Sequence, residues 1–150
     1  MGRRLKPIKP PEGRTVGDLF TWDPQKFSVQ VSEMDREHQK IIQLMNQLHA
    51  LYKQGAPASE QGKALTALAE YTVKHFADEE AYMAKIQYPG LAVHKGVHKN
   101  LLERVGQFAA AFKANGKLGD DLFVFLKMWL SAHICGVDAK YGVHAHEHAA

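Results

Sequence analysis

The sequence predicts an all-α fold, an antiparallel up-down-up-down four-helix bundle with an N-terminal arm. Four long stretches carry apolar residues at helical spacing, and short segments rich in glycine or proline separate them. Because short loops join neighbouring helices in antiparallel order, the four helices should alternate in direction. At 150 residues with 45% hydrophobic content, the chain should form one domain around one core.

The first two predicted helices are bounded by clear stop signals. The first covers about residues 32–54 and ends at Gly55-Ala56-Pro57. The second covers about residues 59–86 and ends before Tyr88-Pro89-Gly90. Their apolar positions recur every three or four residues, as on the buried face of an amphipathic helix. In the first helix these positions are Ile41, Leu44, Met45, Leu48 and Leu51.

The other two predicted helices follow the same pattern. The third covers about residues 91–114 and closes at Asn115-Gly116. The fourth starts near Gly119-Asp120 and ends near Tyr141. Before the first helix, the aromatic segment FTWDPQKF should form an arm that packs across the bundle. The predicted domain organisation therefore has a bundle over residues 21–142.

The two ends of the chain are expected to lie outside the bundle. Residues 1–20 form a basic, proline-containing leader that should be flexible, and residues 143–150 form a histidine-rich tail that should fray. The leader holds five basic and two acidic residues, which accounts for the whole net charge of +3. The bundle itself is therefore neutral, and we expect no nucleic-acid partner.

Two further features of the sequence indicate where in the cell the protein is located. The single cysteine, Cys135, excludes an internal disulfide framework and fits a reducing cytoplasm. We also expect no transmembrane segment, because no uninterrupted apolar run reaches the length of a bilayer span. The predicted location is cytoplasmic.

Histidines and carboxylates interrupt the apolar faces of the predicted helices. His75 and Glu79 are four residues apart and so share one helix face, and His94 and His98 repeat this spacing. Glu80 lies about 140° around the helix from His75 and is expected to reach solvent. Burial of charges requires a partner or a metal ion. The two pairs therefore indicate a polar site inside the bundle.

The fourth helix carries a pair with an irregular spacing. His133 and Asp138 are five residues apart, which corresponds to about 140° on an ideal helix. Gly136 lies between them and weakens the helix locally. We therefore predict a π-type bulge or a loosened turn that brings Asp138 inward, and such bulges often accompany functional sites. Cys135 should point away from this site.

Bundle topology brings these residues to one level. The start of the first and third helices and the end of the second and fourth helices meet at the same end of an antiparallel bundle. Seven potential ligands would exceed a four-coordinate zinc site and suit two metals bridged by carboxylates. His49 lies about 16 Å along the axis from His38 and cannot join them. The predicted metal ligands are His38, His75, Glu79, His94, His98, His133 and Asp138.

Two familiar metal motifs do not fit this pattern. A zincin requires H-E-x-x-H, whereas the segment from His94 to His98 has Lys95 at the position of the glutamate. A ferritin-like carboxylate centre requires two Glu-x-x-His pairs, and the chain has none.

Together, these motifs resemble the hemerythrin family, in particular its bacterial members. The resemblance covers about residues 20–142, and Gln30 is one difference, because family members commonly carry glycine there. The matching segments are Trp22 with the following arm, Met34-Asp35-Arg36-Glu37-His38, His75-Phe76-x-x-Glu79-Glu80-x-x-Met83, Tyr88-Pro89 with His94-x3-His98, and Trp129-x3-His133-x4-Asp138-x-x-Tyr141.

The resemblance implies a non-heme di-iron centre that binds O2 reversibly. It implies that His94, His98 and His133 hold one iron ion and that His38 and His75 hold the other. Glu79 and Asp138 would bridge the two ions together with a hydroxo or oxo group, leaving an open position on the iron with two histidines. Ile42 and Trp129 lie one turn from His38 and His133 and are candidates for the apolar wall of the O2 pocket.

Four functions remain open at this point. We favour O2 storage, transport or delivery, because no second domain is expected in 150 residues. We also expect a monomer without enzymatic activity. The alternatives are an O2 or redox sensor that acts through a partner, a di-iron oxidase or peroxidase, and a structural site for zinc or mixed metals. An unknown O2-accepting or signalling partner would fit the first two functions.

Overall fold

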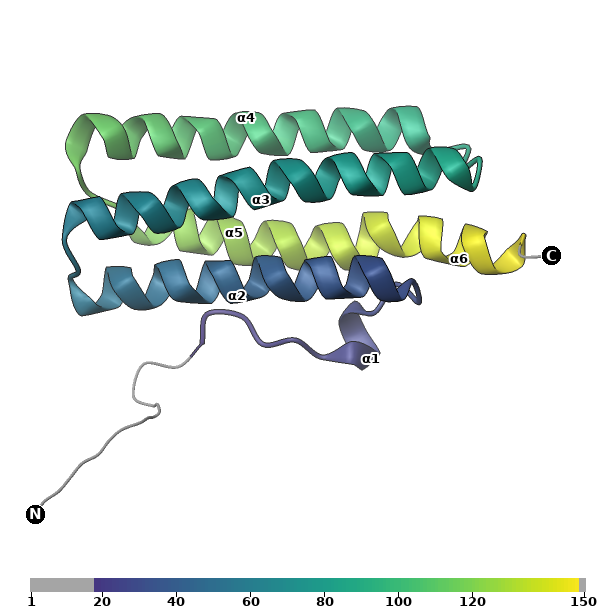
Figure 1. Cartoon of the computed structure of the whole chain (residues 1–150), viewed down its shortest axis with the longest axis horizontal. Coiled ribbons are helices and arrows are strands. Elements are labelled where there is room, and N and C mark those ends of the chain that lie inside the picture. The colour runs from purple at the N-terminus through teal and green to yellow at the C-terminus, as the bar shows by residue number, and fades with distance from the viewer. Residues whose placement is uncertain (1–17, 149–150) are drawn as a thin grey trace, which may run out of the picture.

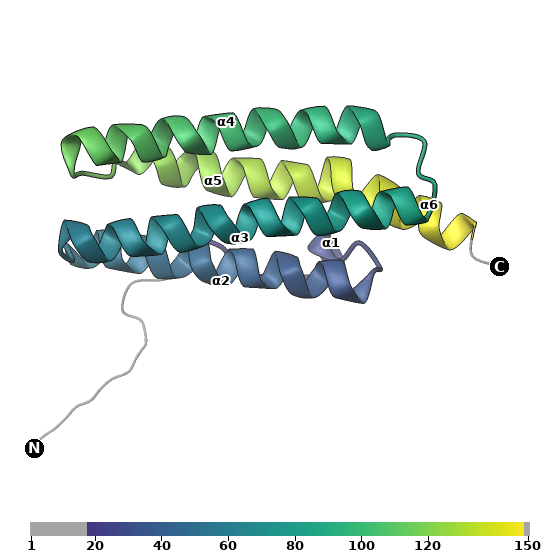
Figure 2. The ribbon, with the colours of Figure 1, turned by 45° about the horizontal axis from the view of Figure 1, so that its top comes forward.

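The computed structural model describes residues 18–148, which form helices and no strands (Figure 1). Four antiparallel rods lie side by side, and Figure 2 shows the same bundle turned by 45°. The predicted fold class is confirmed. The elements are α1 (Pro24–Phe27), α2 (Ser32–Gln54), α3 (Ala58–Lys85), α4 (Leu91–Asn115), α5 (Asp120–His133), η2 (Ile134–Asp138) and α6 (Ala139–Glu147). Each of α2, α3 and α4 forms one rod, and α5, η2 and α6 together form the fourth rod.

Two of the loops between rods begin at glycines in the left-handed conformation. Gly55 follows α2 with φ of 69°, and Gly116 follows α4 with φ of 71°. In each case the backbone N–H of the glycine donates to a carbonyl of the last helical turn. A residue with a Cβ atom is strained in this conformation, so glycine ends these helices at low cost.

The core is built from the predicted apolar stripes. Ile41, Met45 and Leu48 of α2 are fully buried. Leu68 of α3 is also buried, and so are the leucines that recur every four residues along α5. By contrast, α4 contributes only Val105 to the buried apolar set. The bundle is therefore closed mainly by α2, α3 and α5.

The N-terminal arm packs against the bundle as predicted. The side-chain amide of Asn46 holds the backbone of Phe20 at both its N–H and its carbonyl, over 3.0 Å and 2.9 Å. Phe20, Phe27 and Val29 are buried. Phe20 is the first residue of the predicted arm, and it is buried. Residues 1–17 of the predicted leader lie outside the described residues.

The arm ends in a tight contact with α6. Gln30 adopts φ of 62°, the left-handed conformation that glycine meets without strain. Its carbonyl accepts a hydrogen bond from Nε2 of His146 over 2.6 Å. At Gly142, an added Cβ would collide with the carbonyl oxygen of Val29. Only glycine at this position of α6 lets the arm pass so closely.

The fourth rod continues beyond its predicted end. The structure places residues 143–147 in α6, so the expected fraying of this part of the tail was wrong. The physical reason is that His144 contacts residues outside α6. Its Nε2 lies 3.1 Å from the carbonyl oxygen of Ile86, and its ring centroid lies 5.5 Å from that of Tyr88.

The fourth rod also bears on the prediction of no transmembrane segment. By length and composition alone, the stretch Asp120–Glu147 could cross a membrane, with a mean hydropathy of 1.4 over its most apolar window. However, 44% of that window is buried inside the bundle. The core helix of a bundle passes the same test of length and composition. This apolar stretch is therefore weak evidence for a membrane span.

Candidate metal centre

The irregular helix between His133 and Asp138 is the π-helix that the sequence predicts. It covers Ile134–Asp138 and widens the helical turn by one residue, so that two residues five apart can share a face. His133 is 4% exposed and Asp138 is fully buried. Nε2 of His133 lies 3.0 Å from Oδ1 of Asp138. Cys135 is exposed and points away, with Sγ 3.3 Å from the carbonyl of Lys26.

The seven predicted residues meet at one level of the bundle, as expected from the topology. Each of the four rods contributes at least one side chain, and all seven side chains are at most 4% exposed. They are His38 of α2, His75 and Glu79 of α3, His94 and His98 of α4, and His133 and Asp138 of the fourth rod.

The seven side chains form two overlapping groups. One group contains His94, His98 and His133, and the other contains His38 and His75. Both groups include Glu79 and Asp138. Within each group, one ligand atom from every residue lies within 4.8 Å of the others. The geometry therefore offers two adjacent positions for cations, with two carboxylates between them.

The contacts inside the cluster join imidazole nitrogens to carboxylate oxygens. Nε2 of His38 lies 3.1 Å from Glu79 Oε2 and 3.0 Å from Asp138 Oδ2. Nε2 of His98 lies 3.1 Å from Glu79 Oε1, and Nε2 of His94 lies 3.0 Å from Asp138 Oδ1. Two ligands at right angles around an ion at about 2.1 Å would lie about 3.0 Å apart. The spacing therefore fits metal coordination.

Several of these atoms do not form hydrogen bonds despite their proximity. Among the described residues, no partner with hydrogen-bond geometry meets His75 Nε2, His98 Nε2, Glu79 Oε1 or either oxygen of Asp138. Nε2 of His94 also faces Nε2 of His133 at 3.3 Å. Buried polar atoms normally have partners. Cations at the two positions would satisfy these atoms, so the donor set fits a pair of metal ions.

Two carboxylates outside the cluster fix the orientation of two histidines. Glu37 Oε1 lies 2.7 Å from Nδ1 of His75, and Glu80 Oε2 lies 2.8 Å from Nδ1 of His98. Because a carboxylate can only accept, each Nδ1 carries the proton. Each Nε2 then directs its lone pair into the cluster, as a metal ligand requires.

The expected exposure of Glu80 was wrong. Its side chain is only 27% exposed and contacts His98 of α4. A position about 140° from His75 lies on the flank of α3 rather than opposite the core. This flank faces α4, and a glutamate side chain is long enough to reach the neighbouring helix. Sequence reasoning also missed Glu37, although it directly precedes His38.

Tyr141 is a further member of the site, and the sequence analysis included it only as part of a matching motif. It lies one turn after Asp138 and is fully buried. Its hydroxyl donates to Glu79 Oε2 over 2.7 Å. Burial and the nearby charges of Glu79 and Asp138 raise the pKa of Tyr141, so the hydroxyl keeps its proton. It therefore holds the shared carboxylate in place as a permanent donor.

Without cations, the cluster is held together by charge pairing. Burial lowers the pKa of His38, but its contact with Asp138, its hydrogen bond to Glu79 and the charges of both carboxylates raise it to about 10. Burial and the charge of Glu79 raise the pKa of Asp138, but its close contacts with the imidazoles of His133, His38 and His94 lower it to about 2. A proton on His38 therefore occupies the place that a cation would take.

The other histidines lie away from the cluster, as predicted. His49 packs at the other end of the bundle, where its ring lies 4.9 Å from that of Phe123. His144, His146 and His148 lie along α6 and bond to backbone carbonyls.

The two residues predicted for an apolar wall are both buried. Ile42 follows His38 by one turn and is 5% exposed. Trp129 is 7% exposed, and its ring centroid lies 6.5 Å from that of His133. Phe76, which sequence reasoning did not single out, stacks on His98 with ring centroids 3.8 Å apart. Apolar side chains from α2, α3 and α5 therefore lie beside the cluster.

Comparisons with known proteins agree with this geometry. A family model described as the hemerythrin HHE cation binding domain matches residues 29–145. The chain is 36% identical to a bacteriohemerythrin of Methylococcus capsulatus over 83% of this chain and 95% of that protein. It is 35% identical to a myohemerythrin of Riftia pachyptila over 84% of this chain and 93% of that protein.

Solved structures give the same result. A crystal structure of wild-type hemerythrin superposes with a TM-score of 0.78 at 36% identity, covering 83% of this chain and 96% of that chain. A crystal structure of a hemerythrin mutant gives a TM-score of 0.80 at 34% identity, covering 85% and 98%. The fold and the site define a helical-bundle protein with a buried histidine and carboxylate centre. The chain belongs to the hemerythrin family.

Proposed function

We propose that this protein binds O2 reversibly at a centre of two iron ions and serves in O2 storage, transport or delivery. The observation that carries the proposal is the pair of overlapping ligand groups that share two carboxylates. In this assignment His94, His98 and His133 hold one iron ion, and His38 and His75 hold the other. Glu79 and Asp138 bridge the two ions.

The iron pair would supply the electrons that O2 binding requires and recover them on release. The residues of the chain create the conditions for this chemistry. Glu37 and Glu80 keep His75 and His98 in the tautomer that exposes Nε2 to the centre. Tyr141 keeps a proton on its hydroxyl beside Glu79. Burial of all these groups excludes water, which protects a reduced centre from irreversible oxidation.

The composition of the ligand set favours a carrier over an enzyme. Neutral imidazoles outnumber carboxylates five to two in the proposed set. Two carboxylates cannot neutralise two dipositive ions, so the centre remains cationic. A cationic centre resists the further loss of electrons that cleavage of O2 needs. The ligand set therefore supports reversible O2 binding over oxidase or peroxidase activity.

Ile42 and Trp129 are proposed as part of the apolar wall beside the O2 position. Both are buried, and both lie one turn from a proposed ligand. The monomeric state and the cytoplasmic location expected from the sequence stay predictions.

The test is the visible spectrum of anaerobically reduced, iron-loaded protein as O2 is admitted and then removed, with iron content measured on the same sample. We expect two iron ions per chain and a colour that appears with O2 and fades on its removal. A single irreversible conversion would contradict reversible binding. Loss of colour with turnover of an added electron donor would indicate an enzyme, and zinc in place of iron would indicate a structural site.

A further inference from the structure

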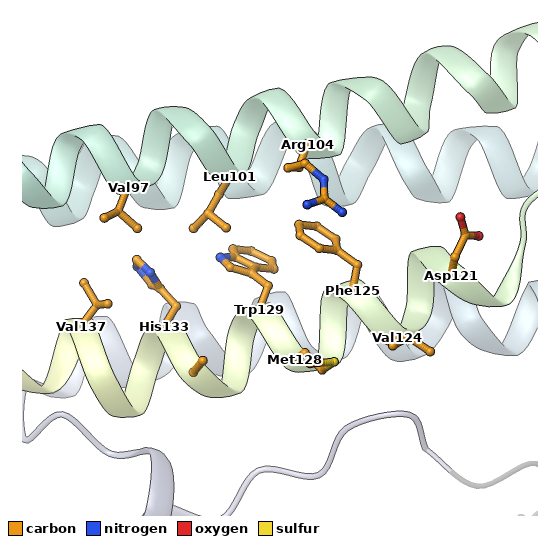
Figure 3. Close-up of a pocket in the computed structure, with 11 residues that line it drawn as sticks. Val97, Leu101, Arg104, Asp121, Val124, Phe125, Met128, Trp129, His133 and Val137 are labelled. Atoms are coloured by element: carbon orange, nitrogen blue, oxygen red, sulfur yellow. The ribbon is translucent and has the colours of Figure 1, made fainter.

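A groove of about 780 Å³ lies between α4 and α5, next to the candidate metal centre (Figure 3). Its walls are apolar, and two of its residues, Val124 and Met128, are 58% and 67% exposed. This volume is typical of pockets that bind small organic molecules. The groove exists because α4 contributes little to the core, so side chains on α5 are left uncovered.

The floor of the groove is lined by aromatic rings. The rings of Phe125 and Trp129 are nearly parallel, with an interplanar angle of 10° and centroids 6.2 Å apart. At the outer end, the guanidinium of Arg104 lies 4.6 Å over the ring of Phe125. Asp121 also lines this end and carries the opposite charge. The floor therefore favours a planar molecule, and the two charges give no net preference for an ion.

One polar atom at the inner end has no partner. Nε1 of Trp129 is buried and meets no hydrogen-bond acceptor among the described residues. In Figure 3 this atom is directed toward the space between Leu101 and His133. A buried donor without an acceptor is unfavourable and rare in folded proteins. The indole N–H is therefore an available donor for a ligand in the groove.

We propose that the groove between α4 and α5 binds an uncharged, planar aromatic molecule whose carbonyl oxygen accepts a hydrogen bond from Nε1 of Trp129. The ring system lies over Phe125 and Trp129, and the carbonyl points to the inner end. The ligand reaches the N–H by displacing the side chain of Leu101, which is only partly buried. The proposal does not depend on which metal occupies the neighbouring centre.

The position of the donor argues against a macromolecular occupant. The surface of a protein partner, or of a second copy of this chain, would contact the exposed side chains of Val124 and Met128. It would not reach the buried N–H of Trp129. A small molecule satisfies both the apolar floor and the donor.

The experiment is equilibrium dialysis of the purified, metal-loaded protein against two ligands of nearly the same shape. Acetylnaphthalene carries the carbonyl oxygen, and ethylnaphthalene lacks it. We expect the ketone to bind about tenfold more tightly, the effect of one hydrogen bond to a buried donor. In Trp129→Phe the preference should disappear while binding of the hydrocarbon persists. Equal affinities in the wild-type protein, or no binding of either ligand, would overturn the proposal.

A second pair of variants keeps the test valid if Trp129→Phe fails to fold. Val124→Glu places a charge at the mouth of the groove and should weaken both ligands at least tenfold. Val73→Glu is the matched control, because Val73 of α3 is 53% exposed and lies outside the groove. Equal effects of the two variants would contradict binding in the groove. A change of oligomeric state in Val124→Glu alone, with ligand affinity unchanged, would assign the groove to a contact between copies.

Discussion

The two halves of the bundle are built from the same helices but differ in the side chains that point inward. On α3, the inward positions Leu65 and Leu68 belong to the apolar half, and His75 and Glu79 continue the same stripe into the polar half. The fourth rod repeats the change, from Leu122 and Leu126 to His133 and Asp138. The backbone geometry is shared by both halves. The apolar half supplies hydrophobic stabilisation, whereas the polar half carries buried charges that need cations or protons.

The largest expected effect follows from removal of a shared carboxylate. Glu79 belongs to both ligand groups, so Glu79→Gln should weaken both metal positions. We expect loss of most of the metal. The loss of affinity should exceed the 10–100-fold change that is typical when a residue that only contacts a metal ligand is replaced. The metal content per chain after dialysis measures this loss of metal. Glu70→Gln, at an exposed position on the same helix, is the control. A Glu79→Gln protein with full iron content and an unchanged visible spectrum would refute the assignment.

The apolar half should respond in the opposite way. Leu68 is 2% exposed in the core, so Leu68→Ala should lower the free energy of unfolding by about 2–5 kcal/mol through lost burial and a cavity. Metal content per folded chain should stay the same, because Leu68 lies about two turns from His75. Denaturant unfolding and metal analysis of the same sample check both statements. Loss of metal in the folded variant would show that the two halves are not separable.

A smaller effect should come from the carboxylate that orients a histidine. Glu80→Gln keeps an acceptor for Nδ1 of His98 but removes the negative charge, so metal affinity should fall about tenfold. Competition with a chelator measures this affinity, with Glu70→Gln again as the control. Indistinguishable affinities of the two variants would mean that the contact between Glu80 and His98 does not tune the centre.

The smallest effect concerns the pH dependence of the metal-free protein. Folding raises the pKa of His38 from 6.5 to about 10, so its stabilising contribution is complete below pH 6.5 and is lost as pH rises to about 10. Folding lowers the pKa of Asp138 from 3.8 to about 2, so its contribution is lost as pH falls through that range. The unfolding midpoint of the chelated wild-type protein should therefore fall as the pH rises from 6.5 to 10.

His38→Gln separates this contribution from other titrating groups. The variant has no proton to lose at that position, so its midpoint should change less over the same pH range. Binding of metal to the wild-type protein at neutral pH should also release a proton from His38. Calorimetry in buffers of different ionisation enthalpy counts that proton. Binding without proton release would contradict a protonated His38 in the metal-free site.

The sequence by itself determined the helices, their inward faces and the meeting of the seven residues at one level. These properties are local or topological: helical spacing decides which side chains share a face, and short loops decide which helix ends meet. Even the π-helix before Asp138 followed from local information, namely a five-residue spacing and a glycine inside it.

Only the tertiary structure decided which flanking side chains touch the cluster and where the chain ends pack. The contact of Glu80 with His98, the contact of Glu37 with His75 and the docking of His144 on Ile86 each join different helices. Such contacts depend on interhelical distances and side-chain rotamers, which helical periodicity does not specify. The groove between α4 and α5 has the same origin, because it reflects how far two helices stand apart.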